Sequence, residues 1–222
     1  LRLGMRQFLV LVLILPMSLF AEDWPQFLGP RRDGSYQGKS LPTWPAEGPK
    51  EIWRMKIGSG FAGPAVADGR LFLFHRTAGR EVLECANATT GKTIWKSQST
   101  ADYVDDFGFD DGPRAVPTIS AGRVYTLGAN GLIKCNDATT GKVLWKVDVR
   151  KQFEAGKGFF GLACSPLVSG RNVLINIGGR SAGIIALDTQ SGKIRWKATE
   201  EKSSYASPIL TKINDKLHAI FF

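Results

Sequence analysis

Short apolar runs alternate with compact polar turns along most of this chain, and the pattern repeats about every fifty residues. Each unit has a Pro that opens a short apolar stretch, then a Gly turn, then a longer run rich in β-branched and aromatic residues. The stretches at 64–74, 117–127 and 166–176 follow this pattern, and a further unit starts at Pro208. A short strand followed by a second strand buried on both faces is typical of such runs. No helical spacing interrupts them, so we expect an all-β repeat protein.

The second half of each unit carries a turn of the form (Ala/Cys)-x-(Asp/Asn)-x-x-(Thr/Ser)-Gly-Lys-x-x-Trp, which occurs three times. We expect the Asp or Asn to accept hydrogen bonds from turn amides, and the Gly to supply the positive φ that reverses the chain. The Trp predicts a wedge between neighbouring sheets, because one four-stranded unit cannot bury both of its faces alone. The repeated residues expected to be structural are Gly91, Gly141, Gly192, Asp137, Asp188, Trp95, Trp145 and Trp196.

These units predict a β-propeller of four-stranded antiparallel blades. We expect blades at about 61–98, 113–149 and 160–199, a partial blade at 204–222, and a closure strand at 50–57. Because the sequence stops in the second strand of the fourth unit, we expect an incomplete propeller, about half of a seven- or eight-bladed ring.

The amino terminus predicts an exported protein. Arg2 and Arg6 precede an unbroken apolar run, and Pro16 and a Ser-Leu-Phe-Ala stretch that ends at Ala21 follow it, which together are typical of a signal peptide over residues 1–21. The apolar run is too short to span a bilayer, so we expect no stable membrane span after cleavage. No Cys lies near Ala21 for lipidation. We therefore expect a periplasmic or secreted protein with an N-terminal extension over residues 22–49.

Composition excludes some functions. The 29 Lys and Arg residues outnumber the 20 Asp and Glu residues, for a formal net charge of +9. The basic residues are spread over turns rather than gathered in one stripe, so nucleic acid is not an expected partner. Cys85, Cys135 and Cys164 include no CxxC pair, and we expect buried, unpaired thiols. His75 and His218 have no partner at metal-binding spacing, so we expect no zinc site.

Two consecutive connections, from Trp95 to Pro117 and from Trp145 to Pro166, are about twice as long as the others. All such connections leave the same face of a propeller, so we expect these two to lie side by side above the central channel, where inserted loops often form a binding surface. The first is acidic and aromatic, and the second is basic and aromatic. The candidate binding residues in them are Asp105, Asp106, Phe107, Asp110, Asp111, Phe159 and Phe160.

The chemistry of these loops leaves alternatives open. They could enclose a polar ligand between ring surfaces, or they could pair with each other. The carboxylates could also hold calcium, although their spacing lacks the alternation of an EF-hand loop. Hydrolysis with Asp110 or Asp111 as an acid or base is a further hypothesis.

Four other positions are expected at the mouth of the channel, because each precedes a repeat Pro by three residues. They are Phe61, Arg114, Ala163 and Tyr205. Arg114 is the strongest candidate among them. Its guanidinium, beside Asp110 and Asp111, could order the loop through a local salt bridge or clamp an anionic group.

The Gly-Lys-x-x-Trp turns resemble the signature of PQQ-like (pyrroloquinoline-quinone-type) propeller repeats, over about residues 50–222. That family includes quinoprotein dehydrogenases, the propeller lipoprotein of the outer-membrane assembly machinery, and many secreted bacterial propellers. The Asp-Trp-Pro-Gln-Phe-Leu-Gly-Pro-Arg stretch at 23–31 is similar to the last group. The resemblance implies the propeller fold, whereas function depends on the site.

Two functions follow from the resemblance. One is a non-catalytic exported scaffold that binds a protein, peptide or glycan partner with its long-loop face. The other is a PQQ-dependent dehydrogenase, which implies the quinone cofactor, a calcium held by Glu, Asn and Asp, a Trp-floored pocket and a vicinal Cys–Cys disulfide. The sequence has no adjacent cysteines. We therefore favour binding over catalysis and expect no cofactor.

Overall fold

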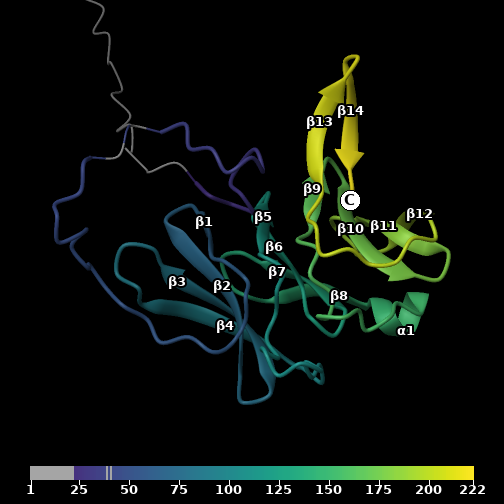
Figure 1. Cartoon of the computed structure of the whole chain (residues 1–222), viewed down its shortest axis with the longest axis horizontal. Coiled ribbons are helices and arrows are strands. Elements are labelled where there is room, and N and C mark those ends of the chain that lie inside the picture. The colour runs from purple at the N-terminus through teal and green to yellow at the C-terminus, as the bar shows by residue number, and fades with distance from the viewer. Residues whose placement is uncertain (1–22, 39, 41) are drawn as a thin grey trace, which may run out of the picture.

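The computed structural model describes residues 23–38, 40 and 42–222, most of which lie in or between antiparallel sheets (Figure 1). Three sheets have four strands each, hydrogen-bonded in chain order, and a fourth sheet has two strands. The predicted all-β class and the four-stranded antiparallel units are confirmed. The predicted signal peptide, residues 1–21, lies outside the described residues and stays a prediction.

The strands follow the repeat units. The first sheet contains β1 (Ala65–Ala67), β2 (Arg70–Thr77), β3 (Arg80–Asn87) and β4 (Thr93–Thr100). The second contains β5 (Thr118–Ser120), β6 (Arg123–Leu127), β7 (Leu132–Asp137) and β8 (Val143–Asp148), and the third contains β9 (Leu167–Ser169), β10 (Asn172–Gly179), β11 (Ala182–Asp188) and β12 (Ile194–Ala198). The fourth contains β13 (Ile209–Ile213) and β14 (Lys216–Ile220), and one short helix, α1 (Val149–Phe153), follows β8.

The outer strands of the first two sheets are each joined to the following sheet by a tryptophan. The indole of Trp95 covers Gly141 so closely that a Cβ on this glycine would lie 2.5 Å from a ring carbon. The Trp95 Nε1–H also donates a hydrogen bond to the carbonyl of Ala138, at 3.2 Å. Trp145 covers Gly192 in the same way. The predicted wedges at Trp95 and Trp145 are therefore confirmed, and the glycine is required by close approach as well as by φ.

The turns under these indoles have the predicted geometry. Gly91, Gly141 and Gly192 have φ values of +67°, +74° and +68°. Asp137 Oδ1 accepts hydrogen bonds from the backbone N–H groups of Thr139 and Thr140, at 3.0 and 2.8 Å, and Asp188 accepts equivalent bonds in the third sheet. The hydrogen bonds from Thr140 hold the pKa of Asp137 below its ordinary value.

A closure strand was predicted at 50–57. The segment forms no strand among the described residues, and the closure itself stays a prediction. Its tryptophan, Trp53, instead covers Gly91 in the way that Trp95 covers Gly141. The Trp53 Nε1–H donates to the carbonyl of Ala88 at 3.1 Å. The first sheet therefore receives the same indole contact as the second and third.

Trp196 does not act as a wedge in the described part of the chain. Its side chain is 42% exposed. In the other sheets the indole covers the glycine of the turn between the third and fourth strands of the next sheet. The described fourth sheet consists of β13 and β14 only, so it has no such turn. For this residue the predicted packing stays a prediction.

The N-terminal segment, purple in Figure 1, runs beside β5 and places Arg32 among the inner ends of three sheets. The side chain is buried, and its guanidinium donates to the carbonyl oxygens of Pro166 and Pro208, and to Thr118 Oγ1. Burial lowers the pKa of Arg32 to about 10. Nothing in the sequence marked this residue, because a single Arg in a polar segment is usually solvated.

Apolar side chains fill the spaces between the sheets. The larger cluster joins the second and third sheets, and a smaller one joins the first and second. The three cysteines are buried and unpaired, as predicted. None of the helices in the described residues is long and apolar enough to cross a membrane.

A buried polar seam also lies between the first two sheets. Glu81 and Lys134 are 1% and 2% exposed, and Glu81 Oε1 accepts a hydrogen bond from the Ala129 N–H at 2.8 Å. The Lys134 Nζ has no hydrogen-bond partner among the described residues. Burial raises the pKa of Glu81 and lowers that of Lys134. Both charges therefore destabilise the fold relative to their neutral forms.

Gly141→Ala tests the indole contact. We expect a loss of about 3 kcal/mol in the free energy of unfolding. The alanine would adopt a strained left-handed backbone conformation, and its Cβ would also collide with the Trp95 ring. Gly122→Ala is the control, since Gly122 has a φ of +70° but no neighbour within 4 Å of a Cβ. It should cost only about 1 kcal/mol. Equal losses in urea denaturation would contradict the wedge.

Glu81→Gln tests the polar seam through its pH dependence. Because the folded pKa of Glu81 lies above the ordinary value of 4.5, the unfolded state loses its proton first as the pH rises, and the wild-type protein loses stability. The variant keeps an acceptor for Ala129 and carries no such loss. Its free energy of unfolding, relative to wild type, should increase as the pH rises above 4.5. A difference that stays constant from acid to neutral pH would show that the charge is not penalised.

Candidate functional site

The two long connections lie side by side, as predicted. The first joins β4 to β5 and the second runs from β8 through α1 to β9. The rings of Phe107 and Phe159 stack across them, with centroids 4.1 Å apart. Lys157 Nζ lies 2.5 Å from Asp106 Oδ1. The loops therefore contact each other through aromatic rings and one ion pair.

The aromatic contacts extend beyond that stack. Phe160 lies edge-on to Phe109 with centroids 6.0 Å apart, and it also contacts the ring of Tyr205 at 5.6 Å. Several of these rings remain open to solvent: Phe109 is 68% exposed, Phe159 55% and Phe107 49%. A group of exposed rings on one face is typical of an interaction surface.

The acidic loop is folded around the carboxylate of Asp105, whose side chain is 1% exposed. Its Oδ1 accepts hydrogen bonds from the backbone N–H groups of Phe107 and Phe109, at 2.9 and 3.2 Å. Its Oδ2 accepts from the hydroxyl of Tyr103 and from Arg114 Nη2, at 3.2 and 3.0 Å. Burial acts to raise the pKa of Asp105, but these hydrogen bonds and the charge of Arg114 outweigh it and hold the pKa below its ordinary value.

Asp110 and Asp111 also satisfy the backbone of this loop. The Asp110 carboxylate accepts from the N–H groups of Gly60 and Gly112, at 3.0 and 2.6 Å. Asp111 Oδ1 accepts from the N–H of Asp105 at 2.7 Å. The carboxylate that pairs with Arg114 is thus Asp105, which corrects the expected pairing with Asp110 or Asp111. Both of those side chains are already engaged by main-chain donors.

Arg114 is held from several sides. Its side chain is 8% exposed, and its guanidinium donates to the carbonyl oxygens of Gly112 and Asp110 as well as to Asp105. The guanidinium carbon lies 4.7 Å from the ring centroid of Tyr103 and 5.6 Å from that of Phe61. Packing and hydrogen bonds therefore fix the group in one orientation.

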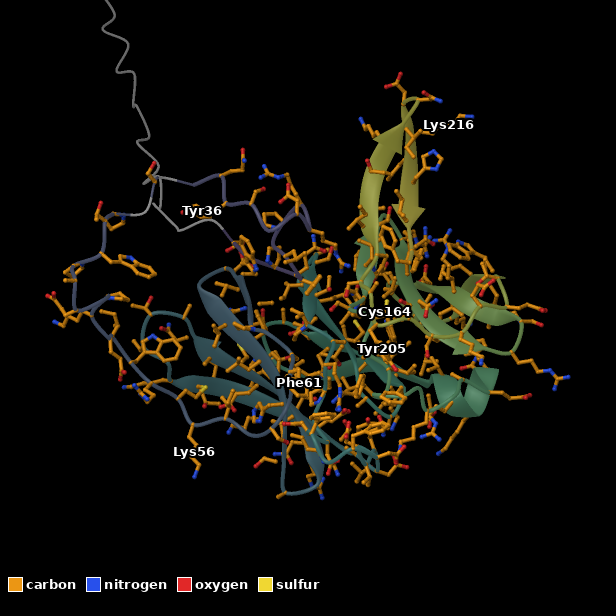
Figure 2. All side chains as sticks on the ribbon, viewed as in Figure 1. Tyr36, Lys56, Phe61, Cys164, Tyr205 and Lys216 are labelled. Atoms are coloured by element: carbon orange, nitrogen blue, oxygen red, sulfur yellow. The ribbon has the colours of Figure 1, made fainter. Side chains whose placement is uncertain are left out.

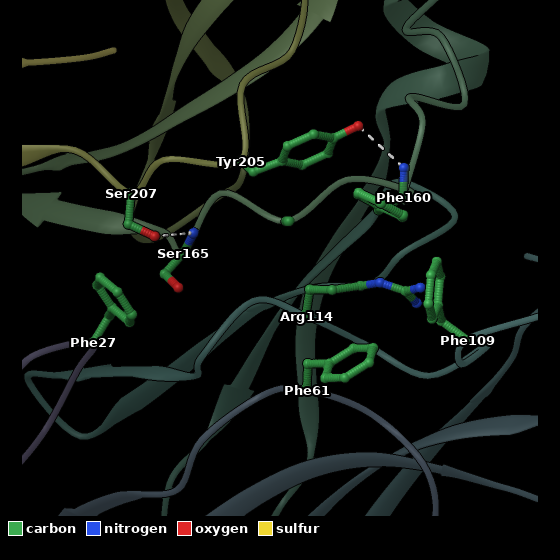
Figure 3. A pocket seen from close by; sticks show the side chains of 9 residues that line it. Phe27, Phe61, Phe109, Arg114, Phe160, Ser165, Tyr205 and Ser207 are labelled. Carbon is green, nitrogen blue, oxygen red and sulfur yellow. Dashed lines mark hydrogen bonds between the residues drawn. The ribbon is translucent and has the colours of Figure 1, made fainter. Parts of the chain in front are cut away.

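A cavity of about 470 Å³ opens next to Arg114. Figure 2 shows Phe61 and Tyr205 near each other in the middle of the molecule, and Figure 3 shows the cavity between them. The residues that line it are Phe27, Phe61, Phe109, Arg114, Phe160, Ala163, Ser165, Tyr205 and Ser207. The four positions three residues before each repeat Pro are thus brought together, along with Phe109 and Phe160. Asp105, Asp106, Phe107, Asp110, Asp111 and Phe159 lie in the adjoining loops and do not line the cavity.

Four lining residues were not among the predicted site residues: Phe27, Phe109, Ser165 and Ser207. Phe109 lies in the acidic, aromatic connection that the sequence analysis singled out. Ser165 and Ser207 each directly precede a repeat Pro, so the same register rule could have found them. Phe27 belongs to the N-terminal segment, and no repeat signal points to it. Contacts between distant segments decide its position.

The polar groups of the cavity are mainly hydroxyls. Tyr205 Oη accepts hydrogen bonds from the backbone N–H groups of Phe159 and Phe160, at 2.9 and 3.1 Å, and Ser207 Oγ accepts from the N–H of Ser165 at 3.0 Å (Figure 3). Each hydroxyl keeps a proton that has no acceptor among the described residues. The cavity therefore combines apolar walls with a few hydrogen-bond donors.

The residues present do not fit the calcium and quinone cofactor that the dehydrogenase hypothesis implies. No carboxylate or amide side chain lines the cavity, whereas calcium needs oxygen ligands of that kind. In the described part of the chain, no group of three or more His, Cys, Asp or Glu side chains could hold a metal ion. The one charged residue of the lining, Arg114, is already paired with Asp105.

Repeated four-stranded sheets around an aromatic cavity define a β-propeller of the PQQ-like class. A protein-family model described as outer membrane protein assembly factor BamB matches residues 79–219, and the chain belongs to this family. No curated protein matches the sequence.

Two solved structures are similar to parts of this chain. Quinohemoprotein alcohol dehydrogenase from Comamonas testosteroni is 23% identical with a TM-score of 0.53, over 79% of this chain and 27% of that one. BamB from Moraxella catarrhalis is 21% identical with a TM-score of 0.46, over 73% of this chain and 42% of that one. The chain thus spans less than half the length of either structure. These likenesses concern the fold alone.

Asp105→Asn tests whether the buried ion pair organises the acidic loop. We expect a clear loss in the free energy of unfolding at neutral pH, larger than that of the control below, because the variant leaves the Arg114 charge without its partner. The folded pKa of Asp105 lies below 3.8, so the wild-type protein loses this stabilisation as the pH falls through the folded pKa, and the variant does not.

The matched control is Asp106→Asn, one residue along. The side chain of Asp106 is 62% exposed, and its pair with Lys157 should contribute less than about 1 kcal/mol. Urea denaturation across acidic pH measures both variants. Equal effects would mean that the buried pair has no special part in the loop.

Proposed function

We propose that this chain is an exported, non-catalytic binding scaffold that takes a protein partner on the face formed by its two long connections. The observation that carries the proposal is the aromatic cavity with exposed rings around it. Phe109 and Phe160 line the cavity, while Phe107 and Phe159 extend the apolar surface beside it. Aromatic residues dominate the binding energy of protein interfaces.

The family description supports a protein partner in particular. A BamB protein is described as an outer membrane protein assembly factor, and such a factor handles polypeptides. Export to the periplasm, which the signal-peptide pattern at 1–21 predicts, would bring the chain into contact with unfolded outer-membrane proteins. A surface of exposed rings on ordered loops suits that substrate class, because extended chains present apolar side chains.

Phe159→Ser tests this proposal. The probe is a dye-labelled outer-membrane β-barrel protein, unfolded in urea and diluted into the wild-type or variant chain, with binding measured by fluorescence anisotropy. The variant removes one ring from the aromatic patch, which is formed by Phe107, Phe109, Phe159 and Phe160. This loss should weaken binding by about tenfold.

Ile94→Ser serves as the control, because Ile94 is similarly exposed, at 49%, but lies on β4 outside the patch. It should leave the affinity unchanged. Equal weakening by both variants, or no binding by the wild-type chain, would overturn the proposal.

A further inference from the structure

The turns of the three four-stranded sheets share one side of the molecule. Each sheet is antiparallel and its strands follow chain order. The turn between the first two strands and the turn between the last two strands therefore lie at the same end of the sheet. Hydrogen bonds join these two turns: the Ala88 N–H donates to the carbonyl of Gly69 at 3.0 Å, and the Ala138 N–H donates to that of Gly122 at 2.9 Å. The long connections leave the outer strands at the opposite end.

Arginine side chains also link the turns of one sheet to those of the next. Arg70 Nη1 donates to Thr139 Oγ1 at 3.3 Å, from the first sheet to the second. Arg123 Nη2 donates to Gln190 Oε1 at 2.5 Å, from the second sheet to the third. The six turns therefore form one continuous surface. This surface, called the turn face below, consists of residues 68–70, 87–92, 121–123, 137–142, 170–171 and 188–193.

The turn face carries an excess of positive charge. Against three carboxylates it has six cations: Arg70, Lys92, Arg123, Lys142, Arg171 and Lys193. Asp23 and Arg195 contact it from neighbouring segments, and their opposite charges leave this balance unchanged. The three lysines are exposed, and none of the ion pairs formed by the described residues includes them. These cations are scattered along the sequence, and the repeat register brings them to one side.

The opposite side of the molecule has the reverse charge. It is formed by the connections at 101–117, 149–166 and 199–207, which together hold eight carboxylates and five cations. The two sides therefore differ in sign. An anionic surface would attract the chain with its turn face forward and its long connections pointing away.

Exposed aliphatic side chains accompany the lysines of the turn face. Each lysine is followed within two residues by one of them: Ile94 is 49% exposed, Leu144 40% and Ile194 41%. A soluble polyanion such as a nucleic acid would attract the lysines but would give these side chains no apolar surroundings. The headgroup region of a bilayer accepts both kinds of group, because phosphates lie next to the ends of the acyl chains.

We infer that the turn face binds the surface of a bilayer that contains anionic lipids. The lysines lie against headgroup phosphates, and the aliphatic side chains that follow them enter the interface. The inference goes beyond the proposed function and does not depend on it. It gives the molecule an orientation in which the aromatic patch faces away from the bilayer.

Co-sedimentation of the whole chain with lipid vesicles tests the charge of the turn face. The vesicles contain equal parts of phosphatidylglycerol and phosphatidylcholine, and vesicles of phosphatidylcholine alone are the lipid control. Replacing Lys92, Lys142 and Lys193 together by Gln should weaken binding to the anionic vesicles by about a hundredfold, at about fivefold for each lysine. Added salt should weaken wild-type binding as well.

The matched control replaces three lysines of the opposite side, Lys151, Lys157 and Lys202, by Gln. Both triple variants have the same net charge and the same residues 1–21, so any contribution of the predicted signal peptide is equal in the two. The control should keep wild-type affinity within about twofold, because its cations face away from the bilayer. Equal weakening by the two variants would show that only total charge matters, and would overturn the inference.

A second triple variant separates a bilayer from a soluble polyanion. Replacing Ile94, Leu144 and Ile194 together by Ser should weaken binding to anionic vesicles by about tenfold. It should leave binding to a double-stranded DNA fragment as it is in the wild-type chain. If the variant binds the anionic vesicles as well as the wild-type chain does, and DNA binds at least as tightly as the vesicles, the turn face is a polyanion site and the inference fails.

A fluorescent label measures the orientation directly. The three native cysteines are buried, so a thiol-reactive dye attaches to an introduced cysteine. The dye at Thr89→Cys, on the turn face, should be quenched by vesicles whose acyl chains carry bromine. The dye at Val104→Cys, on the first long connection, should not. Equal quenching at both positions, stronger quenching at Val104→Cys, or no vesicle binding by the wild-type chain would overturn the inference. Each of these outcomes leaves the proposed function to its own test in solution.

Discussion

The contact between an indole and a glycine turn is the constraint on which the rest of this structure depends. Trp53, Trp95 and Trp145 each cover the glycine of a turn in the next sheet, so that a Cβ there would lie 2.5 to 2.6 Å from a ring atom. Because the contact recurs at the same place in the three four-stranded sheets, it sets how one sheet sits against the next. It also fixes the side on which the connections between sheets emerge, which brings the two long loops together.

The buried pair of Arg114 and Asp105 links the order of those loops to the chemistry of the cavity. Asp105 accepts hydrogen bonds from the backbone of the acidic loop. Arg114 donates to the same carboxylate and also lines the cavity. The same interaction that holds the loop also cancels the charge of the only charged residue in the lining. A surface that the sequence presents as strongly charged is therefore, at its centre, apolar and neutral.

The N-terminal segment contributes to the same region from the other end of the chain. Arg32 binds carbonyl oxygens at the starts of β9 and β13, and Phe27 forms part of the cavity wall. The cavity is thus lined by the segments that lead into all four sheets and by an N-terminal segment that precedes them. A change in the packing of Arg32 would reach the cavity through Ser165 and Pro166.

The sequence by itself determined the sheet class, the position of the glycine turns and the placement of Phe61, Arg114, Ala163 and Tyr205 around one cavity. These features follow from local turn chemistry and from a fixed repeat register, and both are written in short stretches of chain. Only the tertiary structure decided that Asp105 is the partner of Arg114, that residues 50–57 form no strand, and that Phe27 and Arg32 belong to the centre. Each of these depends on which hydrogen-bond donors, hydrogen-bond acceptors and strand edges of distant segments already have partners. A local sequence pattern carries no information about those distant segments.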